Sequence, residues 1–292
     1  MSAPPSRTPR PHAIAHPRSP ASVRPLATLA TTALVACLAA LLLFPRLTGA
    51  QAPLTGGLTG ASLEANVFGQ GVTNRFGDWS GLYVRGIKPM TSDTWYADLL
   101  ALRAFGLRGT QVGLAHRHDW NRRIFHAIGG NMGDGSPIVP RYRVDGSVGL
   151  RMGNRSQWQV TAGGSFVQSI TELHDVAATG SIAWFAPRIV VLELSARLNT
   201  SNPGNVKSQR IAGLVTVTPS QRRSFSLRTI GGTEGWQIIS STRTLQQFAS
   251  QEVSLSWREK LTPRWALSVQ GDLYRNPFYL RSGVTLGAAR YW

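Results

Sequence analysis

Apolar and polar residues alternate along many short segments of the chain after residue 60. In residues 158–166, the even positions are apolar and the odd positions are polar or small. One side of another clear segment carries Val190, Leu192, Leu194, Ala196 and Leu198. A period of two is typical of a β-strand with one apolar and one polar face. Helical periodicity is nearly absent, so the pattern predicts an all-β fold.

This alternation suits either a soluble β-sandwich or a transmembrane β-barrel. The polar strand faces repeatedly carry full charges, which a barrel encloses in its lumen. Tryptophans also lie near the predicted strand ends, where an indole can sit at the lipid boundary with its N–H among the headgroups. A sandwich would instead bury these rings between its sheets. We therefore expect a barrel with an aromatic girdle of Trp79, Trp95, Trp158, Trp184, Trp265 and Trp292.

Turn residues divide the segments at plausible intervals. Short polar connections are expected at residues 74–78, 152–155, 186–188, 219–221 and 260–263, and longer loops at residues 131–140, 200–207 and 232–247. Short turns at one end and long loops at the other are typical of outer-membrane barrels. At roughly 20 residues for each strand and its share of the connections, residues 61–292 predict a transmembrane antiparallel up-and-down β-barrel of about 12 strands, with 14 as the alternative.

One long apolar run, residues 26–44, precedes the alternating segments. The residues Thr48-Gly49-Ala50 that follow are small enough for signal peptidase. We predict a signal peptide over residues 1–50, cleaved after Ala50, and a short Gly-rich linker over residues 51–60. The alternative is a retained anchor, because about 19 apolar residues can span a bilayer.

Residues 1–22 are rich in Pro, Ser and Arg and make an unusually long leader. A start at Val23 would give an ordinary signal peptide, so we interpret Met1 as lying upstream of the true start. The single cysteine, Cys37, excludes an intrachain disulfide. The apolar run continues from Cys37 to Phe44, so lipoprotein cleavage before Cys37 is not expected.

Composition agrees with a barrel. Charged residues make up 15% of the chain, below the roughly 25% of soluble globular proteins. Hydrophobic residues make up 42%, too few for a helical membrane protein. The net charge of +17 does not predict nucleic-acid binding, because the basic residues form no stripe or recognition helix. We expect them to line the lumen and to face anionic lipid headgroups or glycans.

Nine charged residues fall on the polar side of predicted strands and are the candidate lumen charges. They are Arg143, Asp145, Arg151, Glu193, Arg197, Arg228, Glu252, Arg258 and Asp272. Mixed charge indicates a salt-bridged plug or a narrow channel, and excess arginine would favour anions. An inert packed interior is the alternative.

Histidines offer a weak candidate for a metal site. His116 and His118 would share one strand face, with Asp119 or His126 as a third ligand. The simpler interpretation is a strand end near the headgroups, and we predict no metal and no cofactor.

Residue types for a lipid hydrolase are present in Ser165 or Ser169 with His174 and Glu172. Their spacing fixes no geometry, and no hydrolase signature surrounds them. The glycine pairs at residues 129–130 and 231–232 lack the strand-to-helix context of a nucleotide loop. We therefore assign no catalytic residue.

The opening of the barrel region carries a family resemblance. Residues 63–68, the turn Asn74-Arg75-Phe76-Gly77-Asp78 leading to Trp79, and the strand at residues 81–85 resemble the first hairpin of the YaiO family of outer-membrane β-barrels. The resemblance implies a barrel and an outer-membrane location, and it supplies no activity. Arg290, in the outward register of the last predicted strand, departs from the usual apolar pattern, but an arginine near the interface can snorkel.

Together these features predict a single-domain barrel in the outer membrane of a diderm bacterium. We expect contacts with outer-membrane lipids and lipopolysaccharide, and insertion by the barrel assembly machinery through the terminal aromatic strand. The leading interpretation is a non-enzymatic narrow channel or envelope scaffold, linked to polysaccharide or solute passage. The alternatives are a lipid-modifying enzyme of the lipid A or phospholipid hydrolase type and a soluble secreted glycan-binding β-protein.

Overall fold

The computed structural model describes residues 60–292, except residues 170–171, 187–188 and 240–243. The chain divides into two units, Met1–Gly49 and Ala50–Trp292. The expected signal peptide and nearly all of the expected linker lie outside the described residues.

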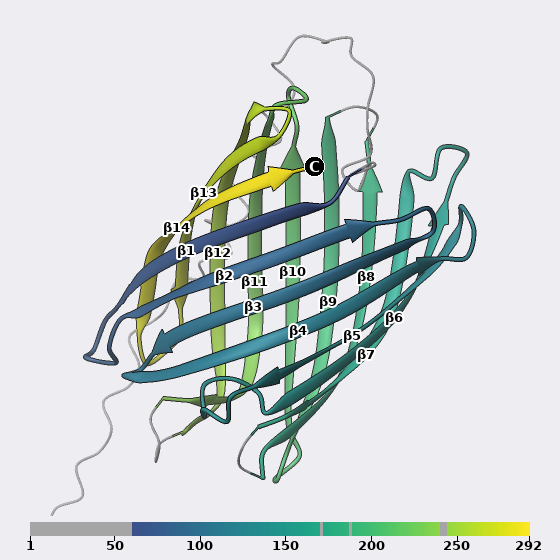
Figure 1. The fold of residues 1–292 in the computed structure, drawn as a ribbon. Coiled ribbons are helices and arrows are strands. Elements are labelled where there is room, and N and C mark those ends of the chain that lie inside the picture. The colour runs from purple at the N-terminus through teal and green to yellow at the C-terminus, as the bar shows by residue number, and fades with distance from the viewer. Residues whose placement is uncertain (1–59, 170–171, 187–188, 240–243) are drawn as a thin grey trace, which may run out of the picture. The chain divides into compact units, whose positions relative to one another are not determined.

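The described residues form one closed sheet of fourteen antiparallel strands (Figure 1). Each strand pairs with its neighbours in sequence, and β14 pairs back onto β1 from Ser62↔Tyr291 to Val72↔Arg281. The strands are β1 (Ser62–Val72), β2 (Trp79–Pro89), β3 (Asp93–Ala104), β4 (Leu107–Asp119), β5 (Ile124–Gly133), β6 (Tyr142–Met152), β7 (Trp158–Gln168), β8 (His174–Phe185), β9 (Val190–Asn202), β10 (Val206–Val217), β11 (Arg223–Ile238), β12 (Thr244–Thr262), β13 (Trp265–Arg275) and β14 (Leu280–Tyr291). Closure leaves the sheet without an exposed edge.

The antiparallel barrel expected from the alternation is confirmed, with the alternative count of 14 strands. No described residue belongs to a helix that is long and apolar enough to cross a membrane.

Two of the expected long loops are mostly strand. β9 ends at Asn202 and β10 begins at Val206, while β11 continues to Ile238 and β12 begins at Thr244. Polar residues in these extensions hide the period of two, although the backbone ladder continues. In β11, Gly232 has φ of 149°, and a Cβ at this position would collide with the backbone carbonyl of Gln209 on β10. Because glycine has no Cβ, the strand continues through this position.

The two ends of the barrel are distinguished by its connections. We call the end at which β1 begins and β14 ends the terminal end, and the opposite end, which carries residues 73–78 between β1 and β2, the loop end. The even number of strands places Ser62 and Tyr291 at the same end.

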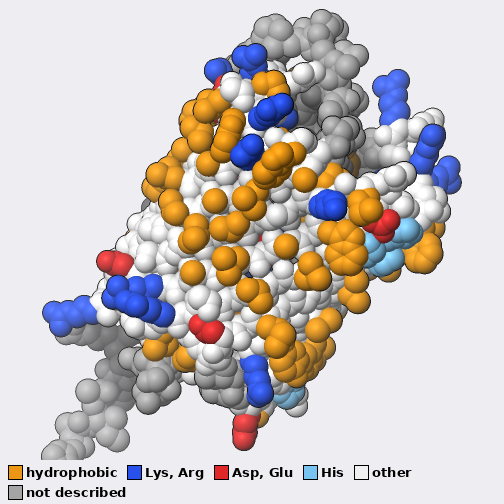
Figure 2. Space-filling view, in the orientation of Figure 1, with side chains coloured by type: hydrophobic (Ala, Val, Ile, Leu, Met, Phe, Trp, Pro, Cys, Tyr) orange, Lys and Arg blue, Asp and Glu red, His pale blue; other side chains and the backbone are white. Residues whose placement is uncertain are grey.

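Large apolar side chains cover the outer surface of the barrel (Figure 2). Those more than half exposed include Val67, Val112, Leu114, Ile128, Val148, Leu194, Leu198, Ile211, Leu255 and Leu286. They alternate with charged and small residues that face inward. A soluble protein places its large apolar residues in the opposite way, whereas a barrel surrounded by lipid requires this arrangement.

Candidate functional site

The turn between β1 and β2 directs an aromatic ring into the loop end. Asn74, Arg75 and Gly77 have φ of 61°, 60° and 77°, so the chain reverses sharply within this turn. Phe76 then packs its ring against Phe105, with centroids 6.3 Å apart. The residues that carry the family resemblance therefore shape the interior of the loop end.

Trp79 follows this turn and also faces inward, which corrects its expected place in the outer girdle. It pairs with the inward-facing Gln70, and its ring centroid lies 5.0 Å from that of Phe105. The guanidinium of Arg281 lies 4.0 Å from the Trp79 ring centroid. An indole at a strand end can point to either side of the wall, and only the strand register decides which.

Further apolar residues close around these rings at the loop end. We call this group the loop-end cluster, which consists of Ile239, Leu245, Phe248, Tyr274 and Tyr279, with Val72, Phe76, Phe105 and Phe278 packed against them. Gln237 Nε2 donates a hydrogen bond of 2.6 Å to the Tyr279 hydroxyl and so joins β11 to the turn before β14.

A cavity of about 270 Å³, the throat cavity, lies beside the loop-end cluster and is lined mainly by apolar residues. It is lined by Trp79, Leu102 and Phe105 on one side, by residues 137–140 of the loop after β5, and by Asp175 and residues 236–238 on other strands. Strands β2, β8 and β11 are not neighbours in the sheet. The cavity therefore lies inside the lumen and not within the wall.

A second cavity of about 160 Å³, the charged chamber, shares Asp175 and Trp236 with the throat cavity. Its other lining residues are Arg197, Asn199, Ser201, Ser208, Arg210, Thr233, Glu234 and Gly235. The lumen thus passes from an apolar compartment to one that contains two arginines and two carboxylates.

The arginines of the charged chamber are loosely held. Arg210 Nη2 lies 3.9 Å from Glu234 and 4.0 Å from Glu252, and Arg210 Nε is buried without a hydrogen-bond partner among the described residues. Arg197 Nη2 donates 3.0 Å to Ser165 Oγ. Fully engaged arginines form short bidentate bonds to carboxylates, so Arg210 retains unused capacity to donate.

Other polar atoms along both cavities also lack partners in the described part of the chain. They are Trp79 Nε1, Asn199 Oδ1, Trp236 Nε1 and Gln237 Oε1. Buried polar groups without partners are rare and cost about 1–3 kcal/mol each. Their concentration here marks the junction of the two cavities as the candidate functional site.

The strand register places all nine candidate lumen charges on the inner face. Arg143 pairs with Asp145 at 2.6 Å, and Gln270 donates to Asp272 at 2.7 Å. Arg258 bonds Glu64 at 3.1 Å. Only Arg197 of the nine lines the charged chamber.

Sequence reasoning missed several inward charges. They include Glu64, Arg85, Asp98, Arg117, Asp119, Asp175, Arg210, Glu234 and Arg281. The even or odd spacing of each of these residues from the apolar positions of its own strand could have assigned it to the inner face. Arg85 and Asp98 form the shortest of these contacts, at 2.7 Å.

The outer tryptophans gather at the terminal end. The other five expected girdle residues, Trp95, Trp158, Trp184, Trp265 and Trp292, lie at this end on outward positions. Trp120, 66% exposed, and Trp257 extend the group and were not expected. Arg290 lies over the rings of Trp265 and Trp292, at 5.7 and 5.2 Å, as its outward register predicts.

The histidines form an outward-facing group at the same end. His116 Nε2 and His118 Nδ1 contact the same oxygen of Asp93, at 2.7 and 2.8 Å. His126 lies beside them, with its ring centroid 5.8 Å from that of His118. Within the described residues, no group of three or more His, Cys, Asp or Glu side chains is arranged to hold a metal ion.

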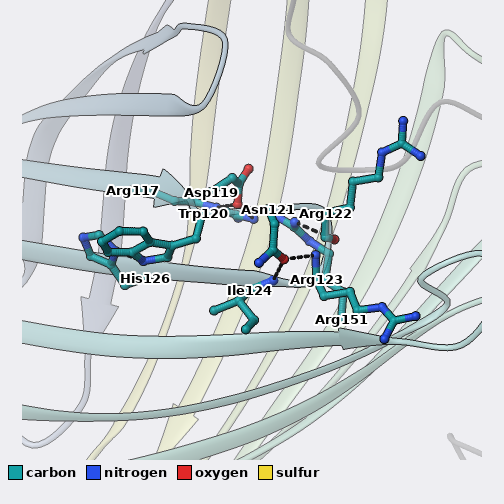
Figure 3. A network of polar contacts seen from close by, with 9 residues as sticks. All are labelled: Arg117, Asp119, Trp120, Asn121, Arg122, Arg123, Ile124, His126 and Arg151. Atoms are coloured by element: carbon teal, nitrogen blue, oxygen red, sulfur yellow. Dashed lines mark hydrogen bonds and ion pairs between the residues drawn. The ribbon is translucent and has the colours of Figure 1, made fainter.

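Asp119, the other suggested ligand, faces inward and joins a different network (Figure 3). It accepts hydrogen bonds from Arg117 at 3.2 Å and from Arg151 at 2.8 Å. Both guanidiniums lie over the buried ring of Phe125, at 4.1 and 4.9 Å. Figure 3 also shows Asn121 accepting from the backbone N–H groups of the turn after β4.

Of the suggested hydrolase residues, Ser165 and His174 do not converge. Ser165 faces inward and binds Arg197, whereas His174 faces outward and stacks on Phe166 with centroids 6.0 Å apart. His174 Nδ1 lies 3.3 Å from the backbone carbonyl of Glu172. A serine and a histidine on opposite faces of the wall do not make a nucleophile–base pair.

A closed barrel with an apolar outer face and a charged inner face is a transmembrane β-barrel. The chain matches the YaiO membrane beta barrel domain over residues 60–235, and it belongs to this family. It is an outer-membrane protein of the bacterial envelope. No curated protein sequence matches it significantly.

Two solved structures share the fold. The CymD monoaromatic hydrocarbon channel is 4% identical, with a TM-score of 0.55 over 80% of this chain and 88% of that chain. A bacterial polysaccharide outer membrane secretin is 8% identical, with a TM-score of 0.52 over 81% of this chain and 99% of that chain. At this identity the likeness concerns the fold alone.

Proposed function

We propose that this protein is a non-enzymatic channel for small solutes in the outer membrane, and that the throat cavity limits permeation. The observation that carries the proposal is the contact between the throat cavity and the charged chamber at Asp175 and Trp236. Two adjoining cavities of different polarity, both inside the lumen, make a path with defined binding positions.

The dimensions favour a small solute over a polysaccharide. Cavities of about 270 and 160 Å³ hold molecules of a few to a dozen heavy atoms, since a cavity of roughly 150 Å³ accommodates benzene. Channel and secretin structures of this fold are known, and the cavity sizes favour the channel role here.

The excess of arginine in the sequence suggested a channel that is selective for anions. The residues of the charged chamber argue for a weaker anion selectivity. Asp175 and Glu234 line the same space as Arg197 and Arg210, so the formal charges balance. We expect a reversal potential near zero in a salt gradient, because selectivity follows the net charge along the path.

The outer surface supports the partners that we propose. The apolar band faces acyl chains, and the tryptophans of the terminal end lie at headgroup level. We orient this end towards the periplasm, and we propose insertion by the barrel assembly machinery through the strand that ends at Trp292.

Planar-bilayer recording with purified protein tests the channel. We expect small, stable conductance steps, and liposomes that contain the protein should swell in small solutes but not in oligosaccharides. If neither current nor swelling appears while the protein shows heat-modifiable migration, the channel is excluded and a scaffold remains.

A further inference from the structure

We propose that the channel selects small zwitterions that carry an aromatic or other apolar end, which is the chemistry of an aromatic amino acid. The apolar end would occupy the throat cavity and the zwitterionic end the charged chamber. This inference rests on the proposed channel function and names its solute class.

The throat cavity fits the apolar end. Leu102, Phe105 and Val139 supply apolar walls, and the ring of Trp79 offers an aromatic face. A flat ring gains both apolar burial and edge-to-face contacts in such a space. Its volume of about 270 Å³ exceeds the roughly 150 Å³ that is sufficient for benzene.

The charged chamber fits the zwitterionic end. Arg210 is 34% exposed and its Nη2 makes only long contacts in the described part of the chain, of 3.9 Å to Glu234 and 4.0 Å to Glu252, so this nitrogen can donate to a solute carboxylate. The carboxylate of Asp175 has no hydrogen bond or ion pair within the described residues, and it lies where the two cavities meet. It is placed to accept from an ammonium group next to the apolar end.

The balance of charge distinguishes a zwitterion from a simple ion. An anion would be attracted by Arg197 and Arg210 but repelled by Asp175 and Glu234, and a cation would meet the reverse. A neutral hydrocarbon would offer no charged partner to Arg210 or to Asp175, which both line the chamber. Only a solute with both charges satisfies both halves of the chamber.

A solute series in proteoliposomes tests the inference. The probes are phenylalanine, 3-phenylpropanoate, which lacks the ammonium, 2-phenylethylamine, which lacks the carboxylate, and alanine, which lacks the ring. Initial uptake of phenylalanine at low concentration should exceed that of each other probe by about tenfold, since an unpaired polar group in a hydrogen-bonding site is strongly penalised. Protein-free vesicles give the background, which is largest for the amine.

Two variants test whether the preference depends on the chamber. In the Arg210→Met variant, phenylalanine should no longer be taken up faster than 2-phenylethylamine. In the Asp175→Asn variant, phenylalanine should no longer be taken up faster than 3-phenylpropanoate. Arg228→Met removes an inner-face arginine that lines neither cavity and should keep both preferences. Heat-modifiable migration shows that each variant is folded.

The outcomes separate the two proposals. Uptake that follows molecular size alone, with no loss in the Arg210 and Asp175 variants, overturns the zwitterion inference and leaves the channel intact. Absence of uptake for all four probes, together with absence of conductance, overturns the channel itself.

Discussion

The ring of Phe76, in the turn after β1, packs against the ring of Tyr279, in the turn before β14, with centroids 5.3 Å apart. Tyr279 is only 2% exposed, and this burial raises the pKa of its hydroxyl. The turn that carries the family resemblance thus closes the loop end against the last hairpin. The family motif and the proposed constriction of the channel therefore lie side by side.

Replacing Phe76 by alanine should widen the throat and weaken the loop-end cluster. The ring packs against both Phe105, which lines the throat cavity, and Tyr279, so its loss should raise single-channel conductance. The cost in unfolding free energy should be about 2 kcal/mol, below the 3–5 kcal/mol of a fully buried phenylalanine because Phe76 is only partly buried. Phe225→Ala, which removes an outward ring that is 43% exposed, is the control for conductance. Equal conductance in both variants would show that Phe76 does not limit the path.

The loop after β5 should respond to acid. The hydroxyl of Thr110 donates to Asp134 at 2.7 Å, its backbone N–H at 2.8 Å, and the N–H of Ser136 at 3.0 Å. These bonds, the Thr110 hydroxyl first, lower the pKa of Asp134 from its ordinary value of 3.8. The charged carboxylate therefore stabilises the loop above pH 3.8, and this stabilisation is lost as the pH falls through the lowered pKa.

Hydrogen exchange of the backbone amides of Ser136, Ile138 and Val139 measures this effect. Exchange, corrected for its intrinsic dependence on pH, should accelerate when the pH falls below 3.8. In the Asp134→Asn variant, the corrected exchange should already be faster at neutral pH and should show no further acceleration in acid. An acid transition of the same size in this variant would assign the effect to another group.

The alternation of residues was sufficient to predict the barrel because lipid and lumen impose opposite demands on adjacent side chains. The same alternation assigns Arg143 and Asp145 to one face, and they lie 2.6 Å apart. The side of the wall that Trp79 faces could not be predicted, because tryptophan tolerates both the headgroup layer and a packed interior. The register of β1 and β2 decides it.

The candidate site was harder to predict than the barrel. Arg210 and Asp175 come from β10 and β8 and meet only because strand pairing and stagger bring them to one level of the lumen. Their sequence contexts resemble those of other polar strand positions. The site is recognised by buried polar atoms, such as Arg210 Nε, that have no hydrogen-bond partner among the described residues. No pattern in the sequence encodes an unsatisfied donor.

The outward tryptophans should couple in pairs. Trp158 on β7 and Trp184 on β8 are directly paired in the ladder, with ring centroids 6.1 Å apart. A double-mutant cycle with alanine should give a coupling of about 0.5–1.5 kcal/mol, measured by urea unfolding in lipid vesicles. Trp95 and Trp265 lie on β3 and β13, four strands apart in the sheet, and their losses should add within about 0.5 kcal/mol. Additive losses for the Trp158 and Trp184 pair would mean that each ring interacts with lipid alone.

Asp119 should contribute more to stability than the other inward carboxylates that pair with arginine, because it holds two guanidiniums. Asp119→Asn leaves Arg117 and Arg151 over the ring of Phe125 without a counter-charge. The three side chains are partly exposed, so the loss of unfolding free energy should be about 1–2 kcal/mol and not the 3–5 kcal/mol of a fully buried pair. Urea unfolding, followed by heat-modifiable migration, measures it.

Asp145→Asn is the matched control, because among the described residues Asp145 forms a salt bridge with one arginine, Arg143, and its loss should cost less. Adding Arg151→Gln to Asp119→Asn should restore part of the stability, since one of the two uncompensated cations is then absent. A larger loss for Asp145→Asn, or no recovery in the double variant, would mean that the two arginines do not repel each other. Their placement would then depend on contact with the ring of Phe125, because cation–π attraction requires no carboxylate.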